Sequence, residues 1–250
     1  MNSRLLATFV TVILLGTAGA AAATVGVPVP ADNGRLLVGF EVEGTKQEVG
    51  EEFLGSTVYL ARFAWPVRPS VTLALLAGGS EVDVESAVHG QKTDFEGRAK
   101  FAAGAGLTWT GPEWAFGARL FADAGVLHVL SEGETRFETT IQSSVFREDY
   151  RNRYSWTDFR IGAGLRFEAG PAVPYVGFLA RALDGNISRE TIQTGATVVD
   201  ATEDFSRGYQ LYALGGVEYW LSDRFLFRLT AAAQGEDEYA WTFGLAEIGF

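Results

Sequence analysis

The stretch that decides the fold is FRIGAGLRF, residues Phe159 to Phe167, because it occurs twice in the chain. The other copy is FAAGAGLTW, residues Phe101 to Trp109, and a Gly-Pro pair follows each copy closely. Apolar residues alternate with other residues in both copies, a period of two that is typical of a β-strand. LYALGGVEY, residues Leu211 to Tyr219, is a weaker third copy. Because each copy leads through a tight turn into another run, the repeated unit is a β-hairpin.

Alternation with a period of two continues along the chain on both sides of the repeat. It defines ten runs: 36–48, 53–65, 71–84, 98–110, 114–130, 154–168, 174–183, 207–221, 224–235 and 239–250. Tight turns rich in Pro, Gly or Asp connect some runs, and longer polar segments such as 131–153 and 184–206 connect others. We predict an all-β fold, a transmembrane antiparallel up-and-down β-barrel of about 10 strands, with 8 or 12 as alternatives, and with short periplasmic turns and long extracellular loops.

The first residues have the organisation of a secretory signal. Arg4 supplies a positive start, residues 5–15 an apolar middle, and residues 17–23 several small-residue cleavage options. The apolar middle is shorter than the roughly 20 residues that a membrane-spanning helix needs. We expect a signal peptide at 1–23, a short periplasmic segment at 24–34 and a barrel domain at 35–250.

Charged residues within the runs fall on the less apolar of the two faces. A Lys or Arg facing lipid at mid-membrane would cost about 2–4 kcal/mol, so we assign the charged face to the lumen. Buried charges must be paired, and a barrel of this size is close to the limit at which side chains fill the interior. We therefore predict a largely filled lumen with an ion-pair network made of Glu41, Glu43, Arg62, Lys100, Arg119, Asp123, Arg160, Arg166, Arg181, Glu218, Arg228 and Glu247.

Size-matched packing is predicted for the rest of the lumen. The large side chains expected there are Phe121, Tyr175, Tyr212, Trp220, Trp241 and Phe243. Inward glycines make room for them, namely Gly104, Gly106, Gly162 and Gly164.

Five runs end alike, with an aromatic ring on the lipid face. These rings predict an aromatic girdle of Trp65, Trp109, Phe167, Tyr219 and Phe250. A last strand of alternating residues that ends in a terminal Phe250 resembles the C-terminal signature of Gram-negative outer-membrane β-barrel proteins, which include small porin-like and OmpA/OmpX-like barrels. The resemblance implies location in the outer membrane and recognition of the last strand by the barrel-assembly machinery.

Evidence for chemistry in the sequence is sparse. The nearest catalytic candidate is His128 with Ser131 and Glu132, but His128 and Ser131 would point to opposite faces of one strand. No His or Cys cluster offers metal ligands, no glycine-rich loop precedes a helix, and we predict no cofactor. The net charge of −11 argues against nucleic acid as a partner.

These features predict a non-enzymatic barrel with a structural or surface-interaction role through acidic extracellular loops. The densest acidic patch is GEDE at 235–238, and the predicted partners are outer-membrane lipid, lipopolysaccharide and weakly bound divalent cations. Echoed segments at 138–143 and 190–194 predict strand extensions above the membrane. The alternatives are an outer-membrane protease or lipid A-modifying enzyme with a rim site near His128, and a narrow ion pore.

Overall fold

The structure, a computed structural model, describes residues 36–49, 52–88, 91–141, 144–193, 196–222, 224–235 and 238–248. The predicted signal peptide, the segment at 24–34 and Phe250 lie outside the described residues. The strands are β1 (Leu37–Val49), β2 (Glu52–Arg68), β3 (Val71–Val88), β4 (Gln91–Arg98), β5 (Lys100–Glu113), β6 (Ala118–Ile141), β7 (Ser144–Phe167), β8 (Ala172–Gln193), β9 (Ala196–Trp220), β10 (Phe225–Gln234) and β11 (Glu238–Ile248). One 3-10 turn, η2 (Ala115–Gly117), joins β5 to β6. Among the described residues, no helix has the length and apolarity needed to cross a membrane.

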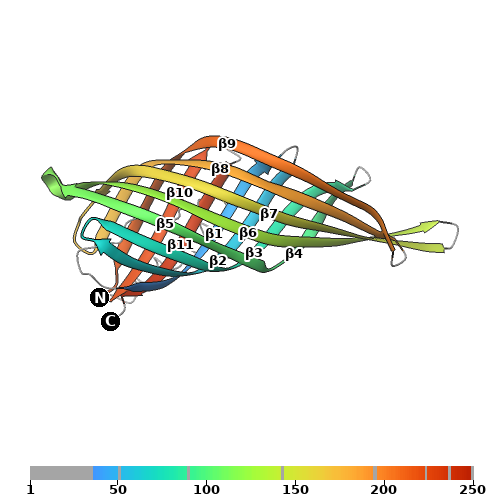
Figure 1. The fold of residues 1–250 in the computed structure, drawn as a ribbon, viewed down its shortest axis with the longest axis horizontal. Helices are drawn as coiled ribbons and strands as arrows, with labels where there is room; N and C mark the ends of the chain where they lie inside the picture. The colour runs from blue at the N-terminus through green and yellow to red at the C-terminus, as the bar shows by residue number, and fades with distance from the viewer. Residues whose placement is uncertain are drawn as a thin grey trace, which may run out of the picture.

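Antiparallel pairing closes the strands into a ring (Figure 1). The seam is the pairing of β1 with β11, which runs from Leu37 opposite Ile248 to Lys46 opposite Tyr239. Strands β4 and β5 both pair with β3 and β6 and are separated by Ala99, so together they fill a single position in the ring. Eleven strands therefore occupy ten positions, 11 − 1, and the predicted all-β antiparallel barrel of about 10 strands is confirmed.

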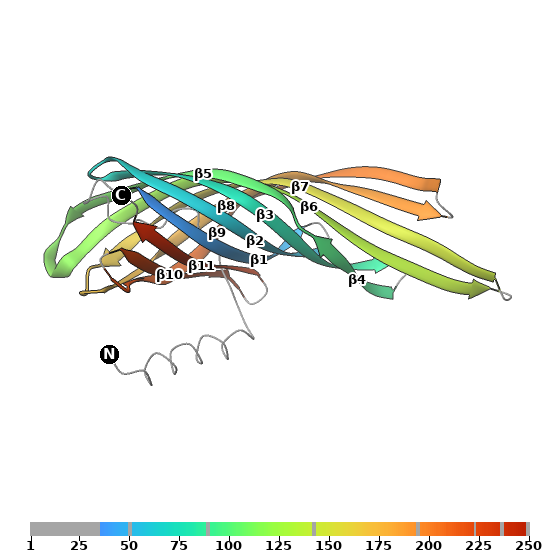
Figure 2. The same cartoon turned by 90° about the horizontal axis from the view of Figure 1, so that it is seen from below.

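The wall of the barrel is uneven in height. Strands β6, β7, β8 and β9 have 24, 24, 22 and 25 residues, whereas β10 and β11 have 10 and 11. Most of the polar segments predicted between the runs, 131–153 and 184–206, are built as strand in these long hairpins, including the echoed segments at 138–141 and 190–193. We call the end from which they project the hairpin end, and the opposite end, where β1 begins and β11 ends, the turn end (Figure 2).

The four long strands continue past the barrel wall as one sheet, which we call the platform. It comprises residues 132–141, 144–153, 188–193 and 196–202. Its register is continuous through β6, β7 and β8, with Glu132 opposite Arg153 and Arg153 opposite Ser188. Strand β9 continues the sheet with Thr202 opposite Ser188, and its register with β8 shifts between Thr191 and Ile192.

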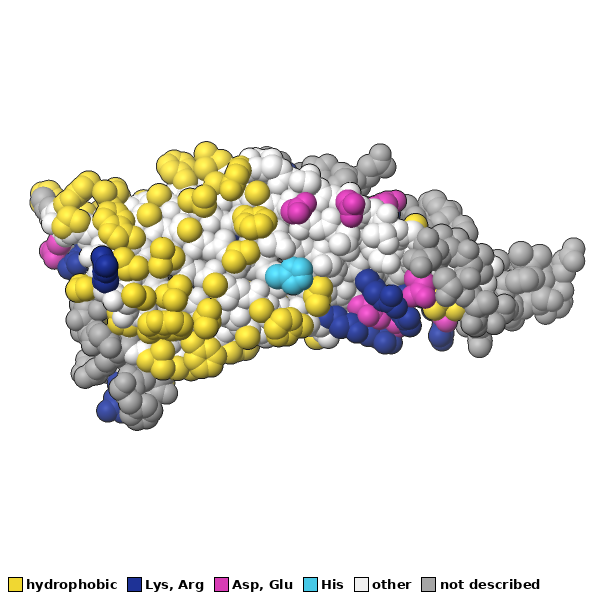
Figure 3. All heavy atoms as spheres, viewed as in Figure 1, with side chains coloured by type: hydrophobic (Ala, Val, Ile, Leu, Met, Phe, Trp, Pro, Cys, Tyr) yellow, Lys and Arg dark blue, Asp and Glu magenta, His cyan; other side chains and the backbone are white. Residues whose placement is uncertain are grey.

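The outer wall carries an apolar band. Phe40, Leu107, Ile161 and Val176 are between 47% and 56% exposed, and their neighbours along each strand face the interior. Figure 3 shows the apolar side chains gathered over the turn-end half of this face, with a few charged side chains at the turn end itself and more toward the hairpin end. Of the predicted girdle, Trp109 is 41% exposed, while Trp65, Phe167 and Tyr219 are half-buried on the same outward face.

In strand β11 the residues that face the lumen are those that the sequence analysis placed on the lipid face. Ala240, Thr242 and Gly244 are buried, whereas Leu245 is exposed. Phe243 stacks edge-on against Phe227 of β10, which places both rings on the outer wall. The prediction that Trp241 and Phe243 face the lumen is therefore wrong, because β11 puts its small residues inside and its rings outside.

Three cross-strand pairs match an aromatic ring with a glycine. They are Phe121 opposite Gly164, Tyr175 opposite Gly216 and Trp241 opposite Gly44. In each pair a Cβ atom on the glycine would lie within 3 Å of the ring or of its hydroxyl. The aromatic ring thus occupies the space that a side chain at the glycine would need. Two of these pairs lie inside the lumen, and the pair of Trp241 with Gly44 lies on the outer wall.

Buried apolar side chains fill much of the lumen in three groups. One group lies near the turn end and consists of Leu37, Ala64, Ala74 and Leu226, with Trp220 packed against it. The second contains Phe121, Tyr175, Leu179, Tyr212, Leu214, Ala232 and Ala240. The largest includes Leu54, Val58, Leu60, Leu76, Val82, Ala102, Leu127, Val129, Tyr154, Trp156, Leu183 and Ile187, with Phe205 beside it.

Candidate functional site

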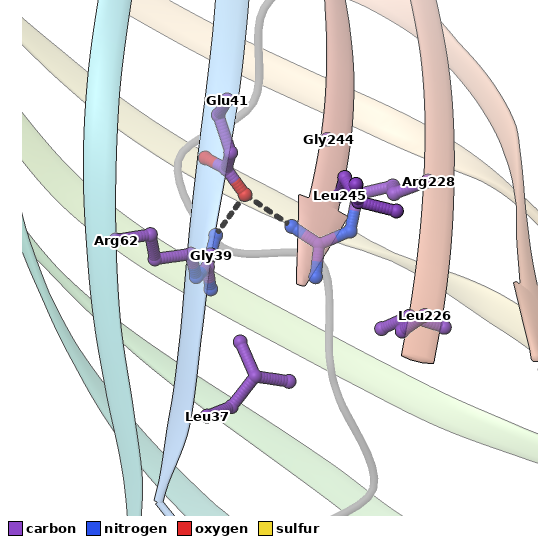
Figure 4. A pocket seen from close by; sticks show the side chains of 8 residues that line it. All are labelled: Leu37, Gly39, Glu41, Arg62, Leu226, Arg228, Gly244 and Leu245. Atoms are coloured by element: carbon purple, nitrogen blue, oxygen red, sulfur yellow. Dashed lines mark hydrogen bonds and ion pairs between the residues drawn. The ribbon is translucent and has the colours of Figure 1, made fainter. Parts of the chain in front are cut away.

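A chain of five alternating charges lies in the lumen nearer the turn end. Arg166 of β7 is 3.7 Å from Glu218 of β9, which is 3.2 Å from Arg228 of β10. Arg228 also contacts Glu41 of β1 at 2.9 Å, and Glu41 accepts a second bond from Arg62 of β2 at 3.0 Å. Figure 4 shows Glu41 held between the two guanidinium groups. The chain of contacts therefore links β7, β9, β10, β1 and β2, and the contact between Arg228 and Glu41 spans the seam.

A second group of charges crosses the lumen. Arg160 of β7 donates to both carboxylate oxygens of Glu43 of β1, through Nη1 at 2.8 Å and through Nη2. The same guanidinium donates from Nε to Asp158 at 2.8 Å, and Arg181 of β8 also donates to Asp158. Since β1 and β7 are not neighbours in the ring, the contact between Glu43 and Arg160 is a strut across the barrel.

Asp123 of β6 lies in the field of both groups. Its side chain is buried, and among the described residues neither of its oxygens has a hydrogen-bond partner. It lies opposite Gly162, where a Cβ atom would come 2.1 Å from Oδ1, so the glycine leaves room for the carboxylate. With Asp123 ionised, these two groups and Asp123 together comprise five arginines and five acids, so their summed formal charge is zero (the acids are Glu41, Glu43, Asp123, Asp158 and Glu218; the bases are Arg62, Arg160, Arg166, Arg181 and Arg228). Glu238, which is also buried, pairs separately with Arg207 at 2.6 Å.

The structure places nine of the twelve predicted network residues inside the lumen, all buried: Glu41, Glu43, Arg62, Asp123, Arg160, Arg166, Arg181, Glu218 and Arg228. Lys100 is at the hairpin-end rim, and Arg119 is at the turn-end rim with Glu113 and Glu168. Glu247 pairs in register with Val38 and Phe225, and its side chain lies outside the described part of the structure.

The sequence prediction missed Asp158. Asp158 lies within the predicted run 154–168 but was not among the twelve predicted network residues, although it is fully buried and accepts hydrogen bonds from two arginines. The signal that could have found it is its spacing of two residues from Arg160, which puts both side chains on the same face of β7.

Little space remains around the chain of five charges. A cavity of about 10 Å³, close to the volume that one water molecule requires, is lined by Leu37, Gly39, Glu41, Arg62, Leu226, Arg228, Gly244 and Leu245 (Figure 4). The arrangement can hold charges and fix the distances between strands, and it leaves no room there for a bound organic substrate.

A third group of charges lies on the outer wall at the hairpin end, and we call it the collar. It consists of Arg98, Lys100, Glu132, Glu134, Arg151, Arg153 and Glu190. Arg151 contacts three carboxylates, Glu134 at 2.8 Å, Glu132 at 3.3 Å and Glu190 at 3.5 Å. The cross-strand ion pairs run from β4 and β5 to β8. Because pairs of opposite charge on neighbouring strands stabilise a sheet, they favour strand structure in these polar segments.

Titration of Glu132 gives a direct test of the collar. Partial burial opposes ionisation of this carboxyl, but the Lys100 ammonium, 3.0 Å away, and the charges of Arg151 and Arg153 outweigh it and hold the pKa of Glu132 below its usual range. The stabilisation is present above the ordinary glutamate pKa and is lost as the pH falls through it toward the lowered value. We expect the carboxyl carbon of Glu132 to titrate below the usual range by NMR, and to move back toward it in Lys100→Met; identical titration in both proteins would contradict the contact.

The structure separates the residues of the candidate rim enzyme. His128 is exposed on the outer wall, with Nδ1 3.1 Å from the Thr157 hydroxyl. Ser131 is buried inside and its hydroxyl donates to the Ser80 carbonyl, while Glu132 belongs to the collar. His128 and Ser131 therefore lie on opposite faces of β6. Within the part of the chain that the structure describes, no group of three or more His, Cys, Asp or Glu side chains could hold a metal ion.

No protein-family model matches the chain, and no curated protein matches it. Among solved structures, the chain is similar to the translocator domain of the autotransporter NalP from Neisseria meningitidis, with 9% identity, coverage of 99% of this chain and 96% of that one, and a TM-score of 0.47. It is also similar to the transport unit of the autotransporter AIDA-I from Escherichia coli, with 10% identity, coverage of 98% and 97%, and a TM-score of 0.41. The attachment invasion locus protein Ail of Yersinia pestis has 13% identity, coverage of 86% and 97%, and a TM-score of 0.32. These structural neighbours are outer-membrane β-barrels.

Proposed function

We propose that the protein is a non-enzymatic outer-membrane β-barrel with a closed lumen, whose role is to hold the four-stranded platform above the membrane as a rigid interaction surface. The observation that carries the proposal is the strut between Glu43 and Arg160, which joins opposite walls of the barrel. A barrel that serves as a passage has no use for side chains that block it, whereas a barrel that supports a surface structure is stiffened by them.

Two further features support this proposal. The apolar band would be costly in water and suits the acyl chains of a bilayer. The platform extends the barrel wall without a break in the ladder of β6, β7 and β8, so its orientation is fixed by the barrel beneath it. Lipopolysaccharide at the platform, the barrel-assembly machinery at the last strand and weakly bound divalent cations at the acidic segments are the partners that we propose.

Electrical recording in planar lipid bilayers tests the closed lumen. We expect the wild-type protein to insert without producing stepwise conductance, because ion pairs and apolar side chains fill the described lumen. A variant with Arg62→Ser, Arg160→Ser and Arg228→Ser removes three guanidinium groups and should conduct if it folds. Stable unit steps from the wild-type protein would overturn the proposal in favour of a narrow ion pore, whatever the variant does.

A further inference from the structure

The collar turns its basic groups outward and keeps its carboxylates beneath them. In three ion pairs the base is the more exposed member: Arg98 at 62% against Glu134 at 25%, Lys100 at 44% against Glu132 at 13%, and Arg153 at 55% against Glu190 at 20%. The surface that an approaching molecule meets is therefore cationic, although the net charge of the protein is −11.

The collar lies at the upper border of the apolar band. Glu132 is two residues beyond Leu130, an exposed residue on the same face of β6, and Arg98 and Arg153 flank Glu132 in register. Phe101, which is 57% exposed, follows Lys100 directly in the chain. Figure 3 shows this group of blue and magenta side chains just past the yellow band. With the band in acyl chains, the bases stand at the height of the lipid headgroups.

The arginines of the collar keep hydrogen-bonding capacity for a ligand. Arg98 contacts Glu134 through Nη2, and Arg153 contacts Glu190 through Nη2. A guanidinium carries five N–H donors in a planar fork that suits two oxygens of a phosphate. The contact of a single guanidinium nitrogen with one carboxylate oxygen therefore leaves N–H donors on Arg98 and Arg153 that a phosphate could bind.

We infer that the collar binds the phosphate groups of anionic lipid headgroups in the outward-facing leaflet, with Arg98, Lys100 and Arg153 as the binding residues. The inference rests on the proposed membrane location. A lipid is the source of phosphate that the geometry favours, because its headgroup is held at this height by the same bilayer that covers the band. Basic side chains near an anionic surface each add about 1 kcal/mol of attraction.

The test counts the lipid molecules that stay bound to the detergent-solubilised full chain by native mass spectrometry. We expect the wild-type protein to retain phosphatidylglycerol in preference to phosphatidylcholine, and less of it as salt is added. The double variant Arg98→Gln with Arg153→Gln should lower retention of phosphatidylglycerol about thirtyfold, the loss expected for about 2 kcal/mol of binding. Equal retention of the two lipids by the wild-type protein would overturn the inference.

Arg136→Gln is the matched control. Arg136 is 63% exposed, against 55% for Arg153, and it pairs with the carboxylate of Asp149 through Nε and Nη2. It lies four residues beyond Glu132 on β6, about 13 Å farther along the strand at about 3.3 Å per residue, and therefore farther from the band. The control should retain lipid like the wild-type protein, whereas the single variant Arg153→Gln, measured alongside it, should retain less. An equal loss in these two single variants would show an effect of overall charge and overturn the inference.

Two further measurements separate the sources of failure. Full displacement of phosphatidylglycerol by inorganic phosphate would mean that the collar takes phosphate in general, and would overturn the assignment to a lipid. Flotation with phosphatidylcholine vesicles tests the membrane location alone. If the protein does not float with them, the proposed function fails; if it floats but shows no headgroup preference, only this inference fails.

Discussion

Replacing Arg160 with methionine is expected to destabilise the folded barrel by about 3–5 kcal/mol, the usual cost of leaving a buried charge without its partner. Arg160 is the residue that bonds both oxygens of Glu43, and it also donates to Asp158. Asp158 keeps Arg181 in the variant, so the cost comes mainly from Glu43, which is 2% exposed and far from water. The measurement is urea unfolding of the protein in detergent micelles, followed by tryptophan fluorescence.

A second variant separates the lost pair from lost packing. Combining Arg160→Met with Glu43→Met removes the stranded carboxylate, so the double variant should recover part of the lost stability. Arg136→Met breaks an exposed ion pair and should cost less than about 1 kcal/mol. An Arg160→Met protein that unfolds at the same urea concentration as the wild type would mean that the strut carries no stability.

Adding one methyl group at Gly216 is expected to cost about 1–3 kcal/mol, the range for an overfilled interior. A Cβ atom there would lie 2.3 Å from the Tyr175 hydroxyl oxygen and 2.5 Å from the Leu229 carbonyl oxygen. The tyrosine has little freedom to move away, because its hydroxyl is 2.5 Å from the Thr230 hydroxyl and 3.3 Å from that same carbonyl. Urea unfolding of Gly216→Ala in micelles gives the value.

Gly208 provides the control on the same strand. It has no atom within 4 Å of its would-be Cβ position and is exposed. Gly208→Ala should stay within about 0.5 kcal/mol of the wild type, as surface substitutions usually do. If both alanine variants lose the same stability, the cause is the chain conformation of β9, and the match between ring and glycine is not responsible.

The barrel fold and most of the residues that line its lumen could be predicted, because alternation with a period of two indicates which residues share a face of a strand. Glu41, Arg62 and Arg228 are interior in the structure for the reason the sequence suggests, namely that their neighbours on the strand are apolar. The contacts among them could not be predicted. Which arginine meets which carboxylate depends on register across strands that are far apart in the chain, as with Glu41 and Arg228.

Strand β11 shows where alternation is ambiguous. Ala240, Thr242 and Gly244 face the lumen, and Trp241 and Phe243 do not, yet both sets are largely uncharged. Hydrophobicity alone does not rank them, because a crowded interior favours small residues as much as a lipid face favours large ones. The partners decide: Gly244 gives space to Glu41 and Arg228, and the Trp241 ring fills the space over Gly44.

The collar could not be predicted from the sequence for a related reason. Arg98, Glu132 and Arg153 come from three different strands and become neighbours only through the register of β4, β6 and β7. Considered singly, Arg98 is the first residue of a predicted run, and Glu132 and Arg153 are charges in a polar segment, which is the ordinary composition of a connection between strands.

The two glutamates of β1 have a consequence for how the chain folds. Glu41 meets Arg228 across 187 residues, and Glu43 meets Arg160 across 117. Contacts between residues so far apart in the sequence form only when the entropic cost of closing very large loops has been offset. We expect these arginines to remain hydrated until β1 joins β11, because their carboxylate partners lie on β1. The interior would then lose its water at this joining step, and a chain with a mismatched charge pattern would be expected to slow there as an open sheet.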